Sequence, residues 1–312
     1  MQTILGAGGD IGSLLAKELK QFSEKIRLVA RYPSQVNGND ELVSADLLDP
    51  DAVSEAVRDS KIVYLTVGLK YDFRIWQSQW PAIIRNVVDA CVLHGSKLVF
   101  FDNVYMYDKG AIPNMTEDSP MAPPSKKGTV RLEVVRHIME AMATRNLKAL
   151  IARSADFYGP ASKNGILNIL VLNAAAKGKK MSWQADPYKV HSFTYTPDAA
   201  KATAMLGNTE SAFGQVWHLP TSSERLTGHQ LIELASGLKM RKASYRVLTP
   251  FILSLGGLFD RSIRELKEMQ YQNDRDYFFN SDKFCTAFAF TPTSYRDGIT
   301  ETLKREYQSL NQ

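Results

Sequence analysis

A cluster of glycines near the start of the chain has the spacing of a phosphate-binding turn. The segment reads Gly6-Ala7-Gly8-Gly9-Asp10-Ile11-Gly12 and lies between a short apolar run and an amphipathic one. Because glycine has no Cβ atom, such a turn can be tight and its backbone can approach a pyrophosphate closely. The N-terminus of the helix that follows favours the negative charge of that group. The spacing therefore predicts that residues 6–12 bind a dinucleotide through its pyrophosphate.

The end of the second apolar run bears on which dinucleotide binds. A site for NAD(H) usually has an acidic residue there, which accepts hydrogen bonds from the adenosine ribose. In this sequence Ala30 stands at that place and Arg31 follows it. A guanidinium can clamp a 2′-phosphate with two hydrogen bonds, whereas a carboxylate would repel it. These residues favour NADP(H) over NAD(H), although an arginine after a strand is also common on protein surfaces.

The elements that must position this turn can be read from the hydrophobic pattern of the first half. Short aliphatic runs predict strands over 3–5, 26–30, 41–44, 62–66, 98–101 and 149–152. Amphipathic runs between them predict helices over 11–22, 50–58, 80–93 and 130–144. This alternation predicts an α/β fold, a Rossmann-type doubly wound parallel sheet with helices on both faces.

The pattern becomes irregular after residue 155. A helix is expected over 166–177, strands near 191–195 and 215–219, and a capping box from Thr227 to Gln230 predicts a helix over 230–238. We therefore expect an NADP(H)-binding Rossmann domain over 1–155, to which a segment at about 191–220 returns. Most of 156–312 is expected to form a smaller C-terminal substrate-binding lobe.

Composition excludes several other classes of protein. The chain has 312 residues and a net charge of +5, and its densest basic stretch, residues 177–180, is too short to indicate nucleic-acid binding. Cys91 and Cys285 have no metal-ligand spacing, so no metal is expected. The longest apolar stretch, 247–259, is broken by Pro250 and too short to span a bilayer. With no secretory leader either, we expect a cytoplasmic protein that binds a small-molecule substrate and no membrane.

Further segments resemble one family, in its order, over roughly residues 1–220. They are the acidic turn 45–49, the strand end 64–68, the strand and loop 98–107, the segment 153–160 and the segment 191–198. With the glycine turn, they resemble the extended short-chain dehydrogenase/reductase family, which includes nucleotide-sugar epimerases and dehydratases. The resemblance implies that Asp46 and Leu47 lie by the adenine. It also implies that Thr66, Val67 and Gly68 pass beneath the cofactor.

The catalytic positions depart from the pattern of that family. Typical members use a Tyr-x-x-x-Lys pair on a helix and a Ser or Thr on the loop after the fifth strand. Aligned with these, the chain has Lys127 for the tyrosine, Arg131 for the lysine and Asn103 for the Ser or Thr. The resemblance therefore implies an atypical member.

Two interpretations of these departures stay open. In the first, Asn103 hydrogen-bonds a substrate oxygen, Lys127 acts as acid and base, and Arg131 holds the nicotinamide ribose. In this interpretation Tyr105 or Tyr107 could also supply a phenol to the substrate from another direction. In the other, Lys127 is an exposed loop residue and the protein is a non-catalytic NADP(H)-sensing or binding protein, similar to the NmrA type.

The substrate side also departs from nucleotide-sugar enzymes. His191 stands where they usually carry an arginine for the diphosphate, and a histidine makes one hydrogen bond rather than a fork. Asp156 stands beside the expected place of the nicotinamide, and Tyr107 is expected on the substrate side too. The sequence favours an oxidoreductase or epimerase/dehydratase-like protein for a small hydroxyl or carbonyl substrate. Monomer and homodimer are both compatible, because the expected pairing face carries Arg85 and Arg136.

Overall fold

The computed structural model describes residues 1–160, 162–240, 242–249, 251–252 and 261–310. Most of the apolar stretch at 247–259, Pro250 included, lies outside the described residues. The chain forms two compact units, each made of three segments. Unit 1 consists of Met1–Met106, Lys126–Ser154 and Ala199–Trp217, and unit 2 of Tyr107–Ser125, Ala155–Asp198 and His218–Gln312.

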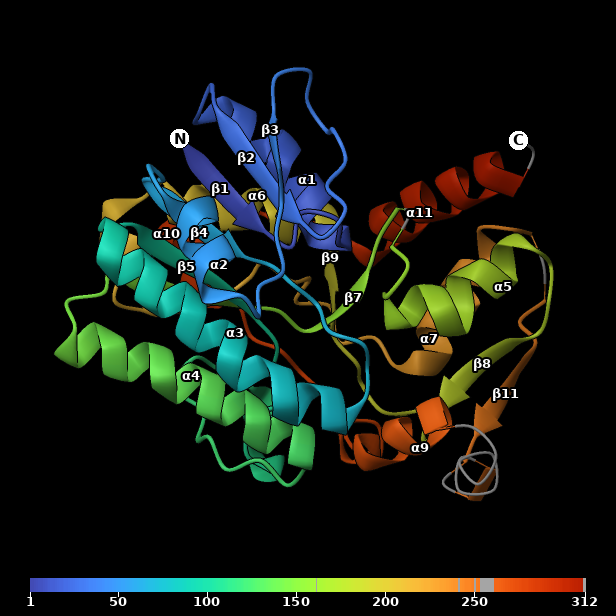
Figure 1. The fold of residues 1–312 in the computed structure, drawn as a ribbon. Helices are drawn as coiled ribbons and strands as arrows, with labels where there is room; N and C mark the ends of the chain where they lie inside the picture. Colours follow the sequence, from blue (N-terminus) through green and yellow to red (C-terminus); the bar gives the residue numbers. More distant parts are fainter. Residues whose placement is uncertain (161, 241, 250, 253–260, 311–312) are drawn as a thin grey trace. The chain divides into compact units, whose positions relative to one another are not determined.

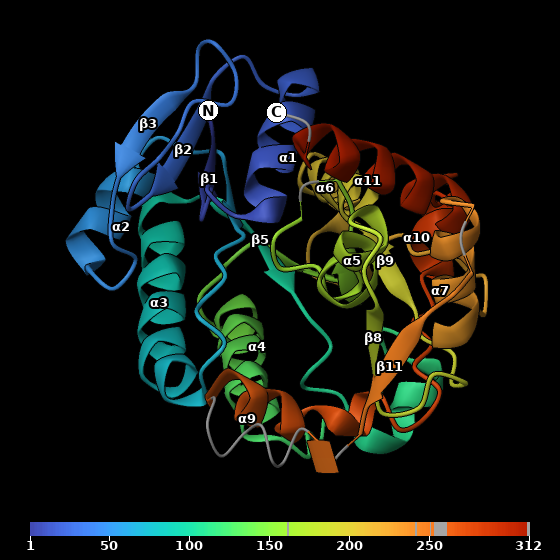
Figure 2. The same cartoon turned by 90° about the vertical axis from the view of Figure 1, so that its right-hand side faces the viewer.

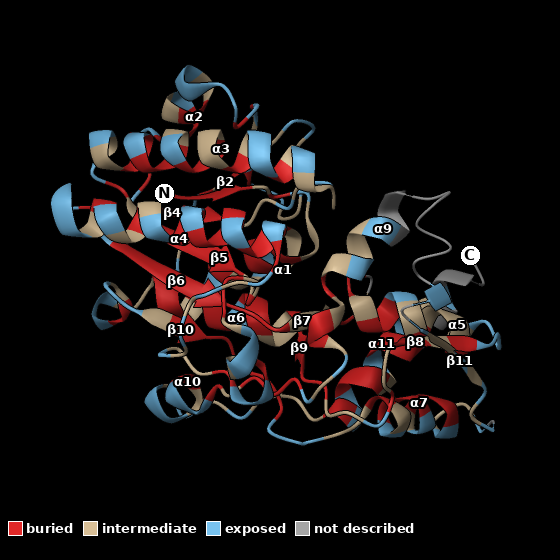
Figure 3. Ribbon diagram, turned by 90° about the horizontal axis from the view of Figure 1, so that it is seen from below, coloured by how far each residue is buried: buried red, intermediate tan, exposed pale blue. Residues whose placement is uncertain are grey.

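Unit 1 is built on a seven-stranded sheet with the order β10-β6-β5-β4-β1-β2-β3. Its strands are β1 (Gln2–Leu5), β2 (Ile26–Ala30), β3 (Glu41–Ser44), β4 (Ile62–Leu65), β5 (Lys97–Asp102), β6 (Ala149–Arg153) and β10 (Val216–His218). The pairings from β3 across to β6 are parallel. Every residue of β1, β4 and β6 is buried, which Figure 3 shows as red for β4 and β6. The prediction of a doubly wound parallel sheet is confirmed.

Helices cover this sheet. They are α1 (Asp10–Glu18), α2 (Pro50–Val57), α3 (Phe73–His94), α4 (Lys126–Thr144) and α6 (Thr196–Gly207). Figure 1 shows α3, in teal, and α4, in green, side by side. Asp49 caps α2 by accepting from the N–H groups of Asp51 and Ala52, and Gly95 ends α3 with a φ of 64°.

Helices α3 and α4 begin several residues earlier than their sequence pattern indicates. Helix α3 starts at Phe73 rather than Trp80 and continues through Pro81, because the first turns bury Trp76 and Trp80. That packing outweighs the hydrogen bond that a proline removes from a helix. Helix α4 starts at Lys126 rather than Val130, so Lys127 belongs to a helix and not to a loop.

Unit 2 contains two pairs of parallel strands. β7 (Asp156–Tyr158) pairs with β9 (Phe193–Tyr195), and β8 (Met181–Gln184) pairs with β11 (Tyr245–Leu248), the pair that Figure 2 shows side by side. The helices are α5 (Asn173–Ala176) after a π-helix (Asn168–Leu172), α7 (Gly228–Gly237), α9 (Arg261–Glu268), α10 (Asp282–Ala287) and α11 (Tyr295–Leu310). The predicted capping box at Thr227 and Gln230 is present at the start of α7. Aromatic residues such as Trp183, Phe193 and Tyr295 form much of the core of this unit.

Short 3-10 helices lie at Leu19–Gln21, Lys109–Asn114, Glu210–Ala212 and Gln270–Gln272. Within the described ranges, no helix is both long enough and apolar enough to cross a membrane.

Candidate functional site

The strand order of unit 1 reverses between β1 and β4. The chain proceeds from β1 outward to β2 and β3, then crosses back to β4 on the other side of β1 and continues to β5 and β6. In open α/β sheets, ligands bind outside the carboxyl ends of the strands at such a point. Gly6 follows β1 there, and Thr66, whose N–H donates to the carbonyl of Leu5 at 2.9 Å, follows β4.

The predicted glycine turn lies tightly against the segment after β4. Gly6 has a φ of +97°, and a Cβ atom at this position would lie 2.5 Å from both the Cα and the N atom of Val67. At Gly12 a Cβ atom would lie 2.7 Å from the carbonyl oxygen of Gly6. The structure therefore brings the predicted residues Gly6, Gly12 and Val67 together, with no room for side chains at the two glycines.

The start of α1 has space for an anion. No side chain caps its N-terminus at Gly9, and a Cβ atom at Gly8 would meet nothing within 4 Å. Asp10 and Ile11 open the helix, and Ile11 is buried, so its contribution to a ligand would come from the backbone. An open space beside an uncapped helix N-terminus fits the pyrophosphate of a dinucleotide.

The predicted adenosine-side residues follow β2 and β3. The side chain of Arg31 is exposed, and its carbonyl accepts from the hydroxyl of Ser44 at 2.9 Å. Asp46 is also exposed and accepts from the N–H of Leu48 at 3.0 Å. Leu47 is buried, and its carbonyl accepts from Asn86 at 3.0 Å. Arg31 and Asp46 thus keep their side chains open to a ligand, whereas Leu47 belongs to the interior.

Lys127 is not the exposed loop residue of the second interpretation. It lies in the first turn of α4 and is 0% exposed. Its Nζ atom lies 4.7 Å from the centre of the Tyr71 ring, on the segment that follows β4. The structure therefore holds this cation against the β4 side of the sheet, in a cation–π contact.

Asn103 follows β5 directly, and its side chain forms a local turn. The Oδ1 atom accepts from the backbone N–H of Tyr105 at 3.0 Å. This bond assigns the oxygen of the amide and leaves the Nδ2 group as a hydrogen-bond donor. Tyr105 is half-buried, and its ring stacks on that of Trp76 with centres 6.0 Å apart.

Arg131 has partners that differ from the expected nicotinamide ribose. Its Nε atom forms an ion pair with Asp102 at 2.6 Å, and its side chain is 5% exposed. A second nitrogen donates to the carbonyl of Phe101 at 3.2 Å. These contacts engage part of the guanidinium within the protein, and its predicted bond to the nicotinamide ribose stays a prediction. Sequence reasoning missed Asp102, although an acidic residue at the end of a buried strand is itself a signal of a charged partner.

In unit 2, Tyr107 also has interior partners. The side chain is buried, and its hydroxyl lies 2.7 Å from Nε2 of His218. The Nδ1 atom of His218 lies 2.7 Å from the carbonyl of Asn280, which makes Nδ1 the donor of the ring. The phenol of Tyr107 therefore donates to Nε2, and its predicted place on the substrate side stays a prediction.

The two other substrate-side residues, Asp156 and His191, pair with each other. Nε2 of His191 lies 2.9 Å from Oδ2 of Asp156, with side-chain exposures of 4% and 23%. The His191 ring stacks on Tyr277, with centres 4.2 Å apart and planes 4° apart. The register between β7 and β9, which sets Asp156 opposite Phe193, brings the pair together. Asp156 is thus the member with an accessible carboxylate, and His191 is the buried one that holds it.

Tyrosines in unit 2 do not resemble the proton-transfer tyrosine of the family. Burial raises the pKa of Tyr195 to about 12 and the pKa of Tyr271 to about 12. Burial also raises the pKa of Tyr158 well above its ordinary value. A proton-transfer tyrosine needs a pKa near the working pH, so these three phenols are unsuited to that role.

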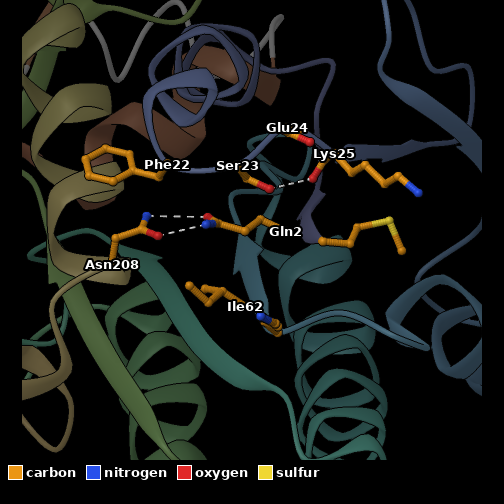
Figure 4. A pocket seen from close by; sticks show the side chains of 9 residues that line it. Gln2, Phe22, Ser23, Glu24, Lys25, Ile62 and Asn208 are labelled. Carbon is orange, nitrogen blue, oxygen red and sulfur yellow. Dashed lines mark hydrogen bonds between the residues drawn. The ribbon is translucent and has the colours of Figure 1, made fainter.

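A recess of about 500 Å³ lies at the opposite end of the sheet, near the amino ends of β1 and β4. Figure 4 shows that Gln2 and Asn208 point toward each other there, with their amides hydrogen-bonded at 2.7 and 3.4 Å. The amino ends of parallel strands are the wrong edge for a dinucleotide, so this recess is not the candidate site. In the part of the chain that the structure describes, no group of three or more His, Cys, Asp or Glu side chains is placed to hold a metal ion.

The sheet order and the turn at its reversal point define a dinucleotide-binding α/β protein. The model of the NAD dependent epimerase/dehydratase family matches residues 3–217. The chain belongs to this family, which confirms the resemblance seen in the sequence.

Solved structures of similar fold include UDP-glucuronic acid 4-epimerase from Bacillus cereus with NAD, at 17% identity and a TM-score of 0.77 over 99% of both chains. UDP-glucose 4-epimerase from Thermus thermophilus with NAD has 17% identity and a TM-score of 0.77, over 98% of this chain and 99% of that one. dTDP-glucose 4,6-dehydratase from Bacillus anthracis with NAD has 18% identity and a TM-score of 0.79, over 100% and 97%. At such identities the likeness shows the fold. No curated protein matches the chain by sequence.

Proposed function

We propose that the protein is a nicotinamide dinucleotide-dependent oxidoreductase or epimerase/dehydratase-like enzyme for a small substrate with a hydroxyl or carbonyl group. The observation that supports this most is the turn at Gly6, which lies at the reversal point of the sheet and excludes any Cβ atom. The similar structures described above contain NAD. In this proposal unit 1 binds the dinucleotide through the turn 6–12.

We propose NADP(H) rather than NAD(H) as the cofactor. Arg31 is exposed at the end of β2, where an acidic residue would select NAD(H), and Ala30 precedes it. The residues that would hold the dinucleotide are those of the turn 6–12, Arg31, Asp46 and the segment Thr66-Val67-Gly68.

The chemistry of the bound cofactor would be hydride transfer to or from the substrate carbon. Asn103, with its Nδ2 group as donor, would hydrogen-bond the substrate oxygen. Lys127 would give that oxygen a proton when a carbonyl is reduced and take one from the hydroxyl in the reverse direction. Tyr105, on the Asn103 loop, is the alternative source of a proton. Asp156, held by His191, is the candidate base of unit 2.

A non-catalytic NADP(H)-binding protein is the second candidate. The observation that favours it is that two replaced catalytic positions have protein partners. Asn103 accepts from its own loop, and Arg131 is paired with Asp102. In this alternative the site recognises the dinucleotide without turnover.

Cofactor choice gives the first test. We expect NADPH to raise the melting temperature more than NADH at equal concentration, because tighter binding to the native state stabilises it by mass action. Arg31→Asp should reverse this order, whereas Arg85→Asp, a matched change on the exposed face of α3, should leave it unchanged. Greater stabilisation of the unchanged protein by NADH would contradict the NADP(H) assignment. Stabilisation by neither nucleotide would contradict the proposed function.

Turnover gives the second test. A screen of small carbonyl compounds that follows NADPH absorbance should find a substrate if the protein is an enzyme. Lys127→Met should then lower the rate by about 100-fold or more, the usual contribution of a positioned acid or base. Lys126→Met, which changes an exposed neighbour on the same helix, is the control. If Lys127→Met keeps the full rate, Lys127 is not the acid or base, and Tyr105 and Asp156 become the candidates for proton transfer.

A further inference from the structure

We propose that Arg131 is a positioning residue, which acts through Asp102 to fix the end of β5 and with it the amide of Asn103. This inference rests on the proposed function, because there Asn103 contacts the substrate oxygen. It assigns to the arginine a role different from that of the lysine it replaces. Arg153 also contacts Asp102, although no sequence pattern connects Arg153 with Arg131.

The carboxylate of Asp102 is held on both sides by arginines. Its Oδ1 atom accepts from Nε of Arg131 at 2.6 Å, and its Oδ2 atom from Nε of Arg153 at 3.0 Å. The side chains of Asp102 and Arg153 are 0% exposed. A carboxylate buried this deeply must keep both partners, because an unpaired charge is costly away from water. The end of β5 is therefore tied to α4 through Arg131 and to β6 through Arg153.

The guanidinium of Arg131 makes a second contact through a different nitrogen from the one that holds Asp102. One of its nitrogens donates to the carbonyl of Phe101 at 3.2 Å while Nε holds Asp102. Its Cζ atom lies over the rings of Trp80 and Phe100, at 4.5 and 4.7 Å from the ring centres. A planar fork suits two acceptors on consecutive residues, whereas an ammonium is a point charge. These contacts account for arginine at this position.

The contacts of Asp102 also restrict the position of Asn103, because Asn103 is the next residue along the chain. The carbonyl of Asp102 accepts from the N–H of Ser154 at 3.0 Å, so backbone and side chain are both held just before Asn103. Just after it, Oδ1 of Asn103 accepts from the N–H of Tyr105. The donor group of the amide is thereby fixed in direction before any substrate arrives. A preorganised donor of this kind stabilises charge that develops on a substrate oxygen.

Hydrogen–deuterium exchange of the Arg131→Met variant tests the proposal without requiring turnover. Methionine keeps the stem and a favourable contact with Trp80 and Phe100, but removes both hydrogen bonds. We expect exchange at least about tenfold faster in peptides covering 98–106, and unchanged exchange in β1 and β2. The Kd for NADPH should change by less than about threefold, because a lost direct bond to a charged donor would cost about tenfold or more.

The other outcomes overturn the proposal. Unchanged exchange in 98–106 removes the positioning role, and faster exchange across the whole of unit 1 shows a general structural role instead. A Kd about tenfold weaker or more shows a direct cofactor ligand. If Arg131→Met does not fold, Arg131→Gln replaces it, since it also removes the ion pair with Asp102 but keeps a polar side chain. This variant too should speed exchange in 98–106, and unchanged exchange there contradicts the inference.

Lys126→Met, at the start of α4, is the control and should behave as the unchanged protein in both measurements. A different result contradicts the proposed function, namely that the unchanged protein binds no nicotinamide dinucleotide. The exchange result then still decides whether Arg131 holds the end of β5.

Discussion

Gly6→Ala is expected to abolish dinucleotide binding and to lower the free energy of unfolding by about 2–5 kcal/mol. A φ of +97° is strained for any residue with a side chain, and the added Cβ atom would lie 2.5 Å from backbone atoms of Val67. The turn must therefore move away from the segment after β4, and its N–H groups lose their arrangement around a pyrophosphate. Urea unfolding measures the loss of stability, and titration with NADPH measures the loss of binding.

Gly8→Ala is the matched control for the fold. A Cβ atom at Gly8 meets nothing within 4 Å, so the free protein should keep its stability to within about 0.5 kcal/mol. If the open space over Gly8 receives the pyrophosphate, this variant should still bind NADPH more weakly. A Gly6→Ala variant that binds NADPH as well as the unchanged protein would contradict the assignment of residues 6–12 to the cofactor.

Asp102→Ala is expected to lower the free energy of unfolding by about 3–5 kcal/mol, because it leaves two buried guanidiniums without their carboxylate. Both Arg131 and Arg153 donate to Asp102, and all three side chains are at most 5% exposed. Unfolding in urea or in guanidinium chloride measures this loss. An m-value equal to that of the unchanged protein shows that the variant still unfolds in the same cooperative transition.

Asp89→Ala provides the control, since Asp89 pairs with Arg145 at the same distance of 2.6 Å but with side-chain exposures of 52% and 39%. An exposed pair contributes about 0–1 kcal/mol, so the two variants should differ by several-fold. Equal effects would show that water reaches the Asp102 cluster.

The order of elements in unit 1 could be predicted from sequence because its inner strands, such as β4 and β6, are buried on both faces. Such strands give continuous apolar runs, and the predicted 62–66 and 149–152 match β4 and β6 to within one residue. The glycine turn was predictable for a related reason, since its chemistry is local in sequence. The pairing of β7 with β9 joins segments distant in the chain and has no periodic signal.

The catalytic region was less predictable because distant residues decide it. Asp102 meets Arg131 and Arg153 across 29 and 51 positions of sequence, and no spacing rule connects them. The early start of α4, which buries Lys127, was hidden because a charged residue there is normally interpreted as a loop. Tertiary packing, rather than local preference, sets the surroundings of each group proposed for catalysis.

The segmented layout of unit 1 has a consequence for biosynthesis. Its last segment, Ala199–Trp217, supplies an edge of the sheet, where the N–H of Gly214 donates to Ala149 and the N–H of Ile151 to Gln215. A chain emerging from the ribosome therefore cannot complete the dinucleotide-binding unit until residue 217 has left the exit tunnel. No contiguous fragment short of that point contains the whole unit, so truncation or gene fusion within the first two thirds of the chain should yield an open sheet edge that invites aggregation.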